Sequence, residues 1–290
     1  MILRRLVLAG AALLPGIAVA QPAPQSVPAP ANPPGNMQWM YGSGESAATS
    51  IQAYRGFRDY VLRRARARPR FSVVLAEGST LEAPRFMPCG RRPLAVVLDV
   101  DETALQNLGY EYDDASHPGR PYDQARWNRW ERTGAGAVLP MPGAVTALQA
   151  IRRNNVTVIF NSNRMAATAD QTEAALNGAG LGPARHGRTL WLQGDAGQGS
   201  AKDARRAAIS RRYCVIAMAG DQLGDFTDLF NARGMPVAER RHAAAAMPFA
   251  GLWGQGWFVL SNPVYGTGLR GTLDDVFPAD RRWSDPQGGN

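Results

Sequence analysis

Lysine is almost missing from this chain of 290 residues. Of its 32 basic residues only Lys202 is a lysine, and all the others are arginines. An arginine cannot simply replace a lysine where one compact ammonium is needed, because the guanidinium is a larger, planar group whose charge is delocalised. The count leaves two alternatives open: Lys202 has a specific role, or it is an exposed lysine that survived by chance.

Histidine and cysteine are also scarce, which excludes several kinds of site. The three histidines, His117, His186 and His242, have neither the spacing of metal ligands nor a serine or cysteine partner in a motif. The two isolated cysteines, Cys89 and Cys214, cannot form a zinc site. An even number of cysteines suits a disulfide in an oxidising compartment.

The apolar run at the amino terminus is too short for a good membrane span. Residues 1–20 contain Arg4 and Arg5, then an apolar stretch with Pro15, then the small-x-small pattern Ala18-Val19-Ala20, which is typical of a cleaved signal peptide. No cysteine lies near this cleavage site to carry a lipid anchor. We therefore expect a periplasmic or secreted protein without a membrane anchor after cleavage, with an uncleaved anchor as the alternative.

Charge is absent from residues 21–36, which are rich in proline and alanine. This composition favours an extended, polyproline-like tether with little to bury. We predict a Pro-rich flexible linker over residues 21–40 and a folded domain over residues 41–290.

The net charge is +8, and removal of the signal leaves 30 basic and 24 acidic residues, a charge of +6. The arginines are spread along the chain and cluster only at 62–70 and 91–92. We therefore expect a small phosphorylated substrate as the partner and no nucleic acid polymer.

From residue 94 onward, short apolar runs alternate with amphipathic segments of helical period. Strands are expected at 94–100, 156–162, 189–193, 214–220 and 256–262. Helices are expected at 46–69, 144–153, 167–178, 200–211 and 223–231. This alternation predicts an α/β fold with a mostly parallel sheet covered by helices on both faces, and an insert at 103–143 after the first strand.

Polar side chains follow several of these strands, and in an open parallel sheet such residues meet beyond the carboxyl ends of the strands. They are Asp99 and Asp101, then Ser162, Asn163 and Arg164, then Asp221 and Asp225, with Lys202 near the start of a helix. We expect them to share one crevice. Carboxylates so close together raise one another's pKa or require a cation.

Four segments in this order resemble the haloacid dehalogenase (HAD) superfamily of phosphohydrolases. They are "DVDET" from Asp99, "NSNR" from Asn161, Lys202, and "GDQLGDF" from Gly220. The stretches "PYDQARWNRW", "LPMPGAV", "GSAKDARRAAI" and "LSNPVYG" are similar to the class C acid phosphatases, the lipoprotein e(P4)-like subfamily IIIB. The resemblance spans about residues 38 to 270. The chain departs from it in lacking the lipid-anchoring cysteine, in having Ser162 where relatives often have threonine, and in having Gly224 before Asp225.

The resemblance implies a HAD-like Rossmannoid core with a small, largely helical cap, and a Mg²⁺-dependent acid phosphatase. Its substrates would be phosphomonoesters, including nucleoside monophosphates. It makes Asp99 the nucleophile that forms an aspartyl-phosphate. Asp101 is then the general acid and later the base, with a pKa that we expect neighbouring carboxylates to raise. The expected Mg²⁺ ligands are the Asp99 carboxylate, the Asp101 backbone carbonyl and Asp221, with Asp225 behind them.

The resemblance also assigns the binding residues. Ser162 and Asn163 would hydrogen-bond the phosphoryl oxygens, Lys202 would neutralise them and keep Asp99 ionised, and Arg164 is grouped with the substrate-binding residues. Trp127 and Tyr265 match aromatic positions over the site of relatives, where they would stack on a nucleobase or nicotinamide ring; the alternative is that both are core residues of the fold.

Three further expectations complete this interpretation. In the family the strands before Asp99 and Asp221 are neighbours, so Cys89 and Cys214 would lie at the same edge of the sheet and form a disulfide. A phosphotransferase of the same fold and a non-catalytic storage or ligand-binding protein are the alternative functions. A homodimer is a possible oligomeric state.

Overall fold

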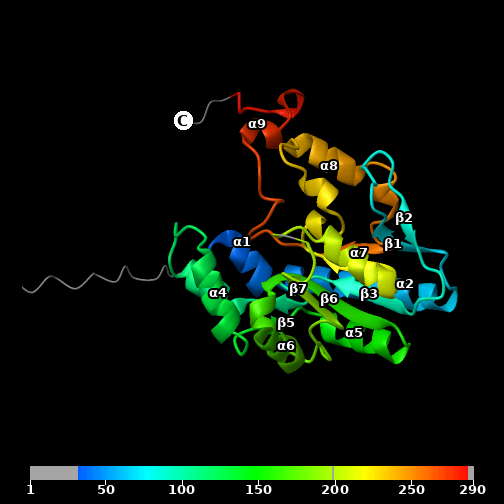
Figure 1. Cartoon of the computed structure of the whole chain (residues 1–290). Coiled ribbons are helices and arrows are strands. Elements are labelled where there is room, and N and C mark those ends of the chain that lie inside the picture. Colours follow the sequence, from blue (N-terminus) through cyan, green and yellow to red (C-terminus); the bar gives the residue numbers. More distant parts are fainter. Residues whose placement is uncertain (1–31, 198, 287–290) are drawn as a thin grey trace, which may run out of the picture.

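The computed structural model describes residues 32–197 and 199–286; the predicted signal peptide and residues 21–31 lie outside them. Five strands form one sheet in the order β7-β6-β3-β8-β9, and every neighbouring pair is parallel (Figure 1). The strands are β3 (Leu94–Leu98), β6 (Thr157–Met165), β7 (Leu190–Gln193), β8 (Cys214–Gly220) and β9 (Trp257–Val259). The predicted α/β fold with a mostly parallel sheet is confirmed.

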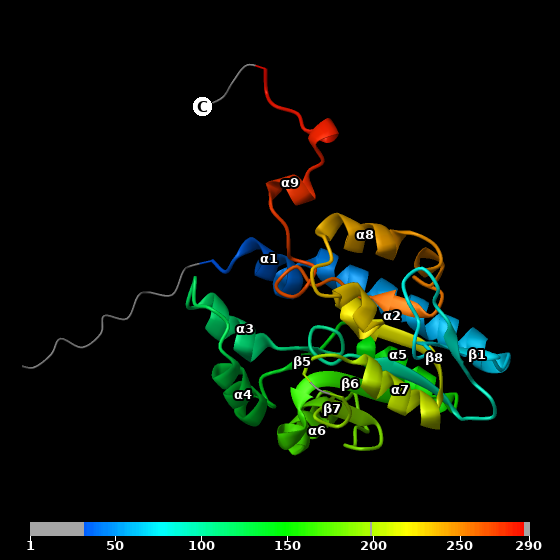
Figure 2. The ribbon, with the colours of Figure 1, turned by 45° about the horizontal axis from the view of Figure 1, so that its top comes forward.

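The sheet is buried on both faces because alternate side chains of each strand enter different hydrophobic cores. Val96 and Leu98 of β3 pack in the core that α2 (Gly44–Arg66), α5 (Ala144–Arg153) and α6 (Ala169–Gly178) cover. Ala95 and Val97 pack in the other core, with α7 (Asp203–Arg212). Figure 2 shows α2 and α7 on opposite sides of the sheet. Among the described residues, no helix is both long and apolar enough to cross a membrane.

The insert after β3 forms a small cap. Its two ends are joined by an antiparallel pair, β4 (Leu105–Gln106) and β5 (Leu139–Pro140). Between them lie the helices α3 (Leu108–Ala115) and α4 (Gln124–Thr133). The cap is therefore largely helical, as predicted, and it lies beside the carboxyl ends of the strands (Figure 2).

Two local predictions differ from the structure. Residues 223–231, predicted as one helix, form two 3₁₀ turns, Leu223–Asp225 and Asp228–Asn231. The reason is local capping: Asp225 accepts the backbone N–H of Gln222, and Thr227 accepts that of Leu229, so side chains take the place of helical hydrogen bonds.

The folded part also begins earlier than the predicted boundary at residue 41. Helix α1 (Gly35–Met37) and a π turn at Gln38–Gly42 precede α2, and Met37 and Met40 are buried. An antiparallel pair that was not predicted, β1 (Phe71–Leu75) with β2 (Phe86–Pro88), lies between α2 and β3. Helices α8 (Val237–Ala245) and α9 (Leu273–Val276) follow the 3₁₀ turns and β9, respectively.

Cys89 and Cys214 form a disulfide, with 4.7 Å between their Cα atoms. Cys214 begins β8 beside Leu94 of β3, so the bridge lies at the amino-terminal edge of the sheet. It closes a sequence separation of 125 residues and links the segment between β2 and β3 to the start of β8.

Candidate active site

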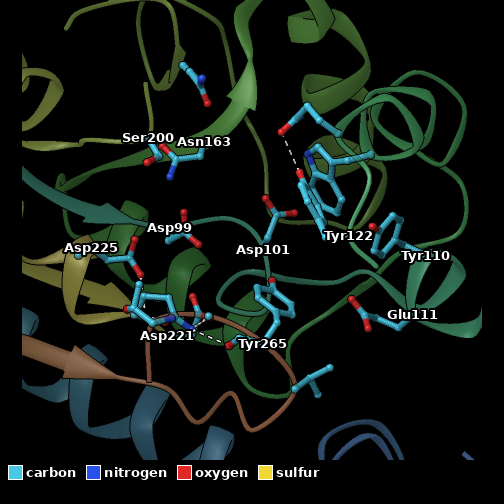
Figure 3. A pocket seen from close by; sticks show the side chains of 18 of the residues that line it. Asp99, Asp101, Tyr110, Glu111, Tyr122, Asn163, Ser200, Asp221, Asp225 and Tyr265 are labelled. Atoms are coloured by element: carbon cyan, nitrogen blue, oxygen red, sulfur yellow. Dashed lines mark hydrogen bonds between the residues drawn. The ribbon is translucent and has the colours of Figure 1, made fainter. Parts of the chain in front are cut away.

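A cavity of about 650 Å³ opens at the carboxyl ends of the strands. Asp99 and Asp101 follow β3, Asn163 lies near the end of β6, Asp221 follows β8, and Lys202 comes from the loop before α7. Figure 3 shows the carboxylates of Asp99, Asp101, Asp221 and Asp225 gathered on one side of this space. The structure thus brings together side chains that are more than 100 residues apart in the chain.

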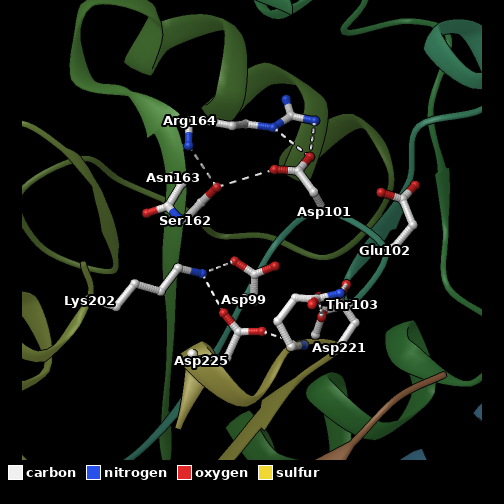
Figure 4. Close-up of polar contacts among 12 residues, drawn as sticks. Asp99, Asp101, Glu102, Thr103, Ser162, Asn163, Arg164, Lys202, Asp221 and Asp225 are labelled. Carbon is white, nitrogen blue, oxygen red and sulfur yellow. Dashed lines mark hydrogen bonds and ion pairs between the residues drawn. The ribbon is translucent and has the colours of Figure 1, made fainter. Parts of the chain in front are cut away.

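Lys202 lies at the centre of the charged cluster (Figure 4). Its Nζ donates to Oδ1 of Asp225 at 2.6 Å and to Oδ1 of Asp99. All three side chains are buried. Burial lowers the pKa of Lys202, but Asp225 and Asp99 raise it by more, so the net shift is upward and the ammonium stays charged.

The carboxylates outnumber this ammonium. Burial raises the pKa of Asp99 well above its ordinary value; Lys202 opposes the rise, and Asp225 and Asp221 add to it. Burial and Asp225 likewise raise the pKa of Asp221 to about 6. Three ionised carboxylates and one ammonium leave a net charge of −2, so the site requires more positive charge.

A divalent cation fits this requirement. Asp99, Asp221 and Asp225 each offer one carboxylate oxygen, and these three atoms lie within 4.8 Å of one another. Asp221 is held in place by hydrogen bonds from Thr103 at 3.1 Å, Gln222 at 2.9 Å and Asn262 at 2.8 Å. Hard oxygen donors of this kind suit a hard cation and not a soft transition metal.

Asp101 and Arg164 form a separate, buried ion pair. Nε and Nη2 of Arg164 donate to Oδ1 of Asp101 at 2.9 and 2.8 Å, and Nδ2 of Asn107 donates to the same oxygen at 2.9 Å. Burial raises the pKa of Asp101, but the Arg164 charge and these hydrogen bonds lower it by more, so the net shift is downward. The predicted upward shift is wrong, because sequence reasoning did not pair Arg164 with this carboxylate.

Arg164 itself lies behind Asp101. Its side chain is 2% exposed, and Nη2 also donates to Oδ1 of Asn107 at 2.8 Å. The cavity is lined by other residues, so the structure does not bring the Arg164 guanidinium to the position of a substrate. Its place indicates that it orients Asp101 and keeps it ionised.

Ser162 and Asn163 are held by hydrogen bonds on two sides. Oγ of Ser162 accepts the backbone N–H of Arg164 at 3.0 Å and donates to Oδ2 of Asp101 at 3.3 Å. Arg205 donates from Nη1 to the Ser162 carbonyl and from Nη2 to Oδ1 of Asn163, each at 2.5 Å. Because Oδ1 of Asn163 already accepts a hydrogen bond from Arg205, the amide nitrogen of Asn163 is the group that can donate a hydrogen bond in the cavity.

Trp127 and Tyr265 both line the cavity, the first from α4 of the cap and the second from the segment after β9. The Trp127 ring lies edge-on to Tyr110 with 4.9 Å between centroids. The Tyr265 hydroxyl donates to Oε2 of Glu102, and the residue as a whole is 37% exposed. Neither ring belongs to the two hydrophobic cores of the described residues, so the alternative that both are core residues does not describe them.

Glu131 connects the cap to the core. Its buried carboxylate accepts from Nε1 of Trp127 at 2.6 Å, from the hydroxyl of Thr168 at 2.6 Å and from the backbone N–H of Met165 at 3.2 Å. One side chain therefore fixes the edge of the Trp127 ring and holds α4 against the segment that follows Arg164.

The sequence interpretation missed both Glu131 and Arg205. A signal for Arg205 exists: it lies three residues after Lys202, and positions i and i+3 share one side of a helix. Glu131 gives no such signal, because an acidic residue in a polar helix is ordinarily on the surface.

Comparison with protein families decides the identity. The family model for the acid phosphatases of HAD superfamily subfamily IIIB matches residues 66–268. The chain belongs to this family. The resemblance on which the sequence interpretation depended is therefore confirmed.

Solved structures of class C acid phosphatases share the fold of this acid phosphatase. The class C acid phosphatase from Bacillus anthracis with tungstate bound is 24% identical, with a TM-score of 0.63; the match covers 80% of this chain and 84% of that chain. A second structure of the Bacillus anthracis enzyme, also 24% identical over the same shares of the two chains, has a TM-score of 0.61. A search of curated proteins found no match.

Arg205→Lys tests the role of Arg205 in the acid phosphatase. Lysine keeps the positive charge but loses the fork that contacts Ser162 and Asn163 together. We expect kcat/KM for a phosphomonoester to fall about 10- to 100-fold, the loss expected when one or two hydrogen bonds to a charged group are broken. The matched control is Arg211→Lys, in the same helix but exposed. Steady-state kinetics with unchanged values for Arg205→Lys would refute this role.

Glu111, a buried residue of α3 that lines the cavity, provides a test of pH dependence. Burial, with Glu102 and Asp114 nearby, raises the pKa of Glu111 to about 8. The folded protein therefore binds more protons than the unfolded chain between about pH 4.5 and 8, so this residue lowers the free energy of unfolding as the pH rises through that range.

Between pH 5 and pH 8, we expect the free energy of unfolding of Glu111→Gln to rise by about 2 to 4 kcal/mol relative to that of the parent, because glutamine cannot ionise. Urea unfolding at both pH values measures this, with Glu239→Gln on the exposed surface of α8 as the control. A difference between parent and Glu111→Gln that is the same at pH 5 and pH 8 would contradict the raised pKa.

Proposed function

We propose that this acid phosphatase is an exported, Mg²⁺-dependent enzyme that hydrolyses phosphomonoesters, including nucleoside monophosphates, through a phosphorylated Asp99. One observation carries the proposal: Asp99 is a buried carboxylate that lines the cavity and is held by the only lysine of the chain. The signal-like residues 1–20 support the export.

Mg²⁺ would be held by Asp99, Asp221 and Asp225, the three carboxylates whose oxygens converge. When bound, it would supply positive charge that offsets the excess of carboxylates and attracts a phosphoryl group. Lys202 keeps one oxygen of Asp99 engaged and neutralised, which leaves the other carboxylate oxygen for the reaction. The Asn163 amide is the donor beside them, whereas the Ser162 hydroxyl is fully buried, does not line the cavity and donates to Asp101.

In the first step, the Asp99 carboxylate attacks phosphorus and the bond between phosphorus and the ester oxygen breaks. The alcohol leaves with a proton from protonated Asp101. In the second step, Asp101, now ionised, removes a proton from water, and the water oxygen attacks the phosphorus of the aspartyl-phosphate. Phosphate leaves and both carboxylates return to their starting states.

Arg164 supports this proton transfer. By pairing with Asp101 it favours the ionised form, which is the form that activates water in the second step. The first step uses the protonated form, whose fraction grows as the pH falls. This requirement fits the acid phosphatase family.

The lining of the cavity favours a substrate that contains a ring. Trp127 and Tyr265 line the same cavity as Asp99 and Lys202. Glu131 accepts a hydrogen bond from the Trp127 ring nitrogen, and Glu102 accepts one from the Tyr265 hydroxyl. A nucleobase placed against such rings gains stacking energy of about 1 to 3 kcal/mol. A nucleoside monophosphate would thus contact both parts of the cavity.

Asp99→Asn tests the nucleophile. An amide cannot form the acyl-phosphate, so we expect hydrolysis of p-nitrophenyl phosphate at pH 5 to 6 to fall by about 10⁴-fold or more. Asp170→Asn, on the exposed surface of α6, is the matched control. EDTA should abolish the parent activity and added Mg²⁺ should restore it. Full activity in Asp99→Asn or in EDTA would refute the mechanism.

Trp127→Ala tests the proposed nucleotide substrate. We expect KM for a nucleoside monophosphate to rise about 5- to 150-fold, in line with the stacking energy, while KM for glycerol 2-phosphate, which has no ring, changes less than twofold. Trp283→Ala is the control, since this residue is 79% exposed. Equal effects on the two substrates would exclude ring recognition by Trp127.

A further inference from the structure

Arginines that have no part in the active site gather at the opposite edge of the sheet. A pair of them precedes each of four neighbouring strands: Arg91 and Arg92 before β3, Arg152 and Arg153 before β6, Arg185 and Arg188 before β7, and Arg211 and Arg212 before β8. Parallel strands begin at a common edge, so these pairs lie away from the cavity at the carboxyl ends.

The end of α2 and the residues after it add five more: Arg63, Arg64, Arg66, Arg68 and Arg70. We call these thirteen residues the arginine edge. In Figure 1, the end of α2 and the β1–β2 pair lie on the right, and α4 of the cap lies on the left. The arginine edge and the cap are therefore at opposite ends of the molecule.

Hydrogen bonds join the segments of the arginine edge into one surface. They are Arg68 Nη2 to the Arg92 carbonyl at 2.7 Å, Cys214 N to the Pro93 carbonyl at 2.8 Å, Arg212 Nη1 to the Gly187 carbonyl at 3.1 Å, and Arg152 Nη2 to the Leu181 carbonyl at 2.6 Å. These contacts run from the end of α2 across the starts of β3 and β8 to the loops around β7.

The charge of this surface is not neutralised by ion pairs. Among the described residues, no arginine of the edge forms an ion pair with a carboxylate. The acids that contact its loops, Glu173 and Asp195, bind His186.

Helix dipoles explain only part of this pattern. Arginine in the last turn of a helix is favoured by the negative end of the dipole, and this applies to α2, α5 and α7. The arginines at 68–70, 91–92 and 185–188 lie outside helices, so this effect does not account for them. All the edge arginines except Arg92 and Arg152 are exposed.

We propose that the arginine edge binds the anionic headgroups of a lipid surface and turns the active site toward solution. Each arginine near such a surface adds to the attraction, and its fork can hold a phosphate through two hydrogen bonds. Phe71 is 47% exposed, and the Arg70 guanidinium lies 5.4 Å from its ring centroid, which gives the surface one apolar side chain beside the charges.

The shape of the surface favours a lipid bilayer over a nucleic acid. The charges are spread across four neighbouring strand starts, which are about 4.8 Å apart from one strand to the next, and across the end of α2. Proteins that bind single strands use a groove with stacked aromatic rings, and readers of duplex DNA insert a helix or a ribbon. The choice of a lipid surface as the partner depends on the proposed export, which would bring the protein to membrane surfaces.

Vesicle sedimentation tests the proposal with the full chain. The probes are vesicles of phosphatidylcholine alone and of phosphatidylcholine with a quarter of phosphatidylglycerol. The edge variant carries Arg91→Gln, Arg153→Gln, Arg188→Gln and Arg211→Gln, one exposed arginine before each strand. The control variant removes the same charge from exposed positions elsewhere: Arg129→Gln, Arg132→Gln, Arg233→Gln and Arg241→Gln.

We expect the parent to bind the anionic vesicles in 50 mM salt and to be released in 300 mM salt, because salt screens this attraction. The edge variant should bind at least tenfold more weakly, and the control variant should stay within twofold of the parent. Phosphatase activity should be unchanged in the edge variant, so a failure of the proposed catalytic function would be seen separately, as absent turnover in the parent.

Four outcomes would overturn the proposal. They are equal binding of the parent to uncharged and anionic vesicles, parent-like binding by the edge variant, an equal loss in the control variant, and no binding of the parent to the anionic vesicles. The third would mean that only net charge matters. After the fourth, binding of the parent to duplex DNA in a gel-shift assay at 50 mM salt would assign the surface to a nucleic acid.

Discussion

The ammonium of Lys202, buried between Asp99 and Asp225, is the interaction on which the active site depends. The fold fixes its position, because Asp228 accepts the backbone N–H groups of Lys202 at 2.9 Å and of Asp203 at 2.6 Å. The lysine comes from the start of one helix and the aspartates from the ends of two strands. Tertiary structure alone therefore brings the charges together, and the sheet has to be complete before the site exists.

The cavity contains two neighbouring groups of charged residues that differ in net charge. Asp101 is matched by Arg164, so this pair is neutral and fixed, which suits a group that transfers protons without moving. Asp99, Asp221 and Asp225 share one ammonium, so this cluster keeps an excess of negative charge. Burial and the neighbouring carboxylates raise the pKa of Asp99 and of Asp221, and the excess of negative charge provides the affinity for a cation. Neighbouring carboxylates thus have different tasks because their cationic partners differ.

Much of this arrangement could be predicted from the sequence. The apolar strands and helical periods give the parallel sheet, and the rule that sites form at strand ends brings Asp99, Asp101 and Asp221 to one place. The Asp101–Arg164 pair and the Arg205 contacts could not be predicted, because they depend on side-chain directions within the folded loops. The 3₁₀ turns at 223–231 were missed for a related reason: capping by Asp225 and Thr227 overrides an otherwise helical pattern.

Titration calorimetry with Mg²⁺ measures the cation site without any substrate, and so decides whether the excess of carboxylates holds the cation. We expect one saturable site in the parent protein, an affinity at least tenfold weaker in Asp221→Asn, and an unchanged affinity in Asp170→Asn. If Asp221→Asn bound Mg²⁺ as tightly as the parent, the excess of carboxylates would not be what holds the cation.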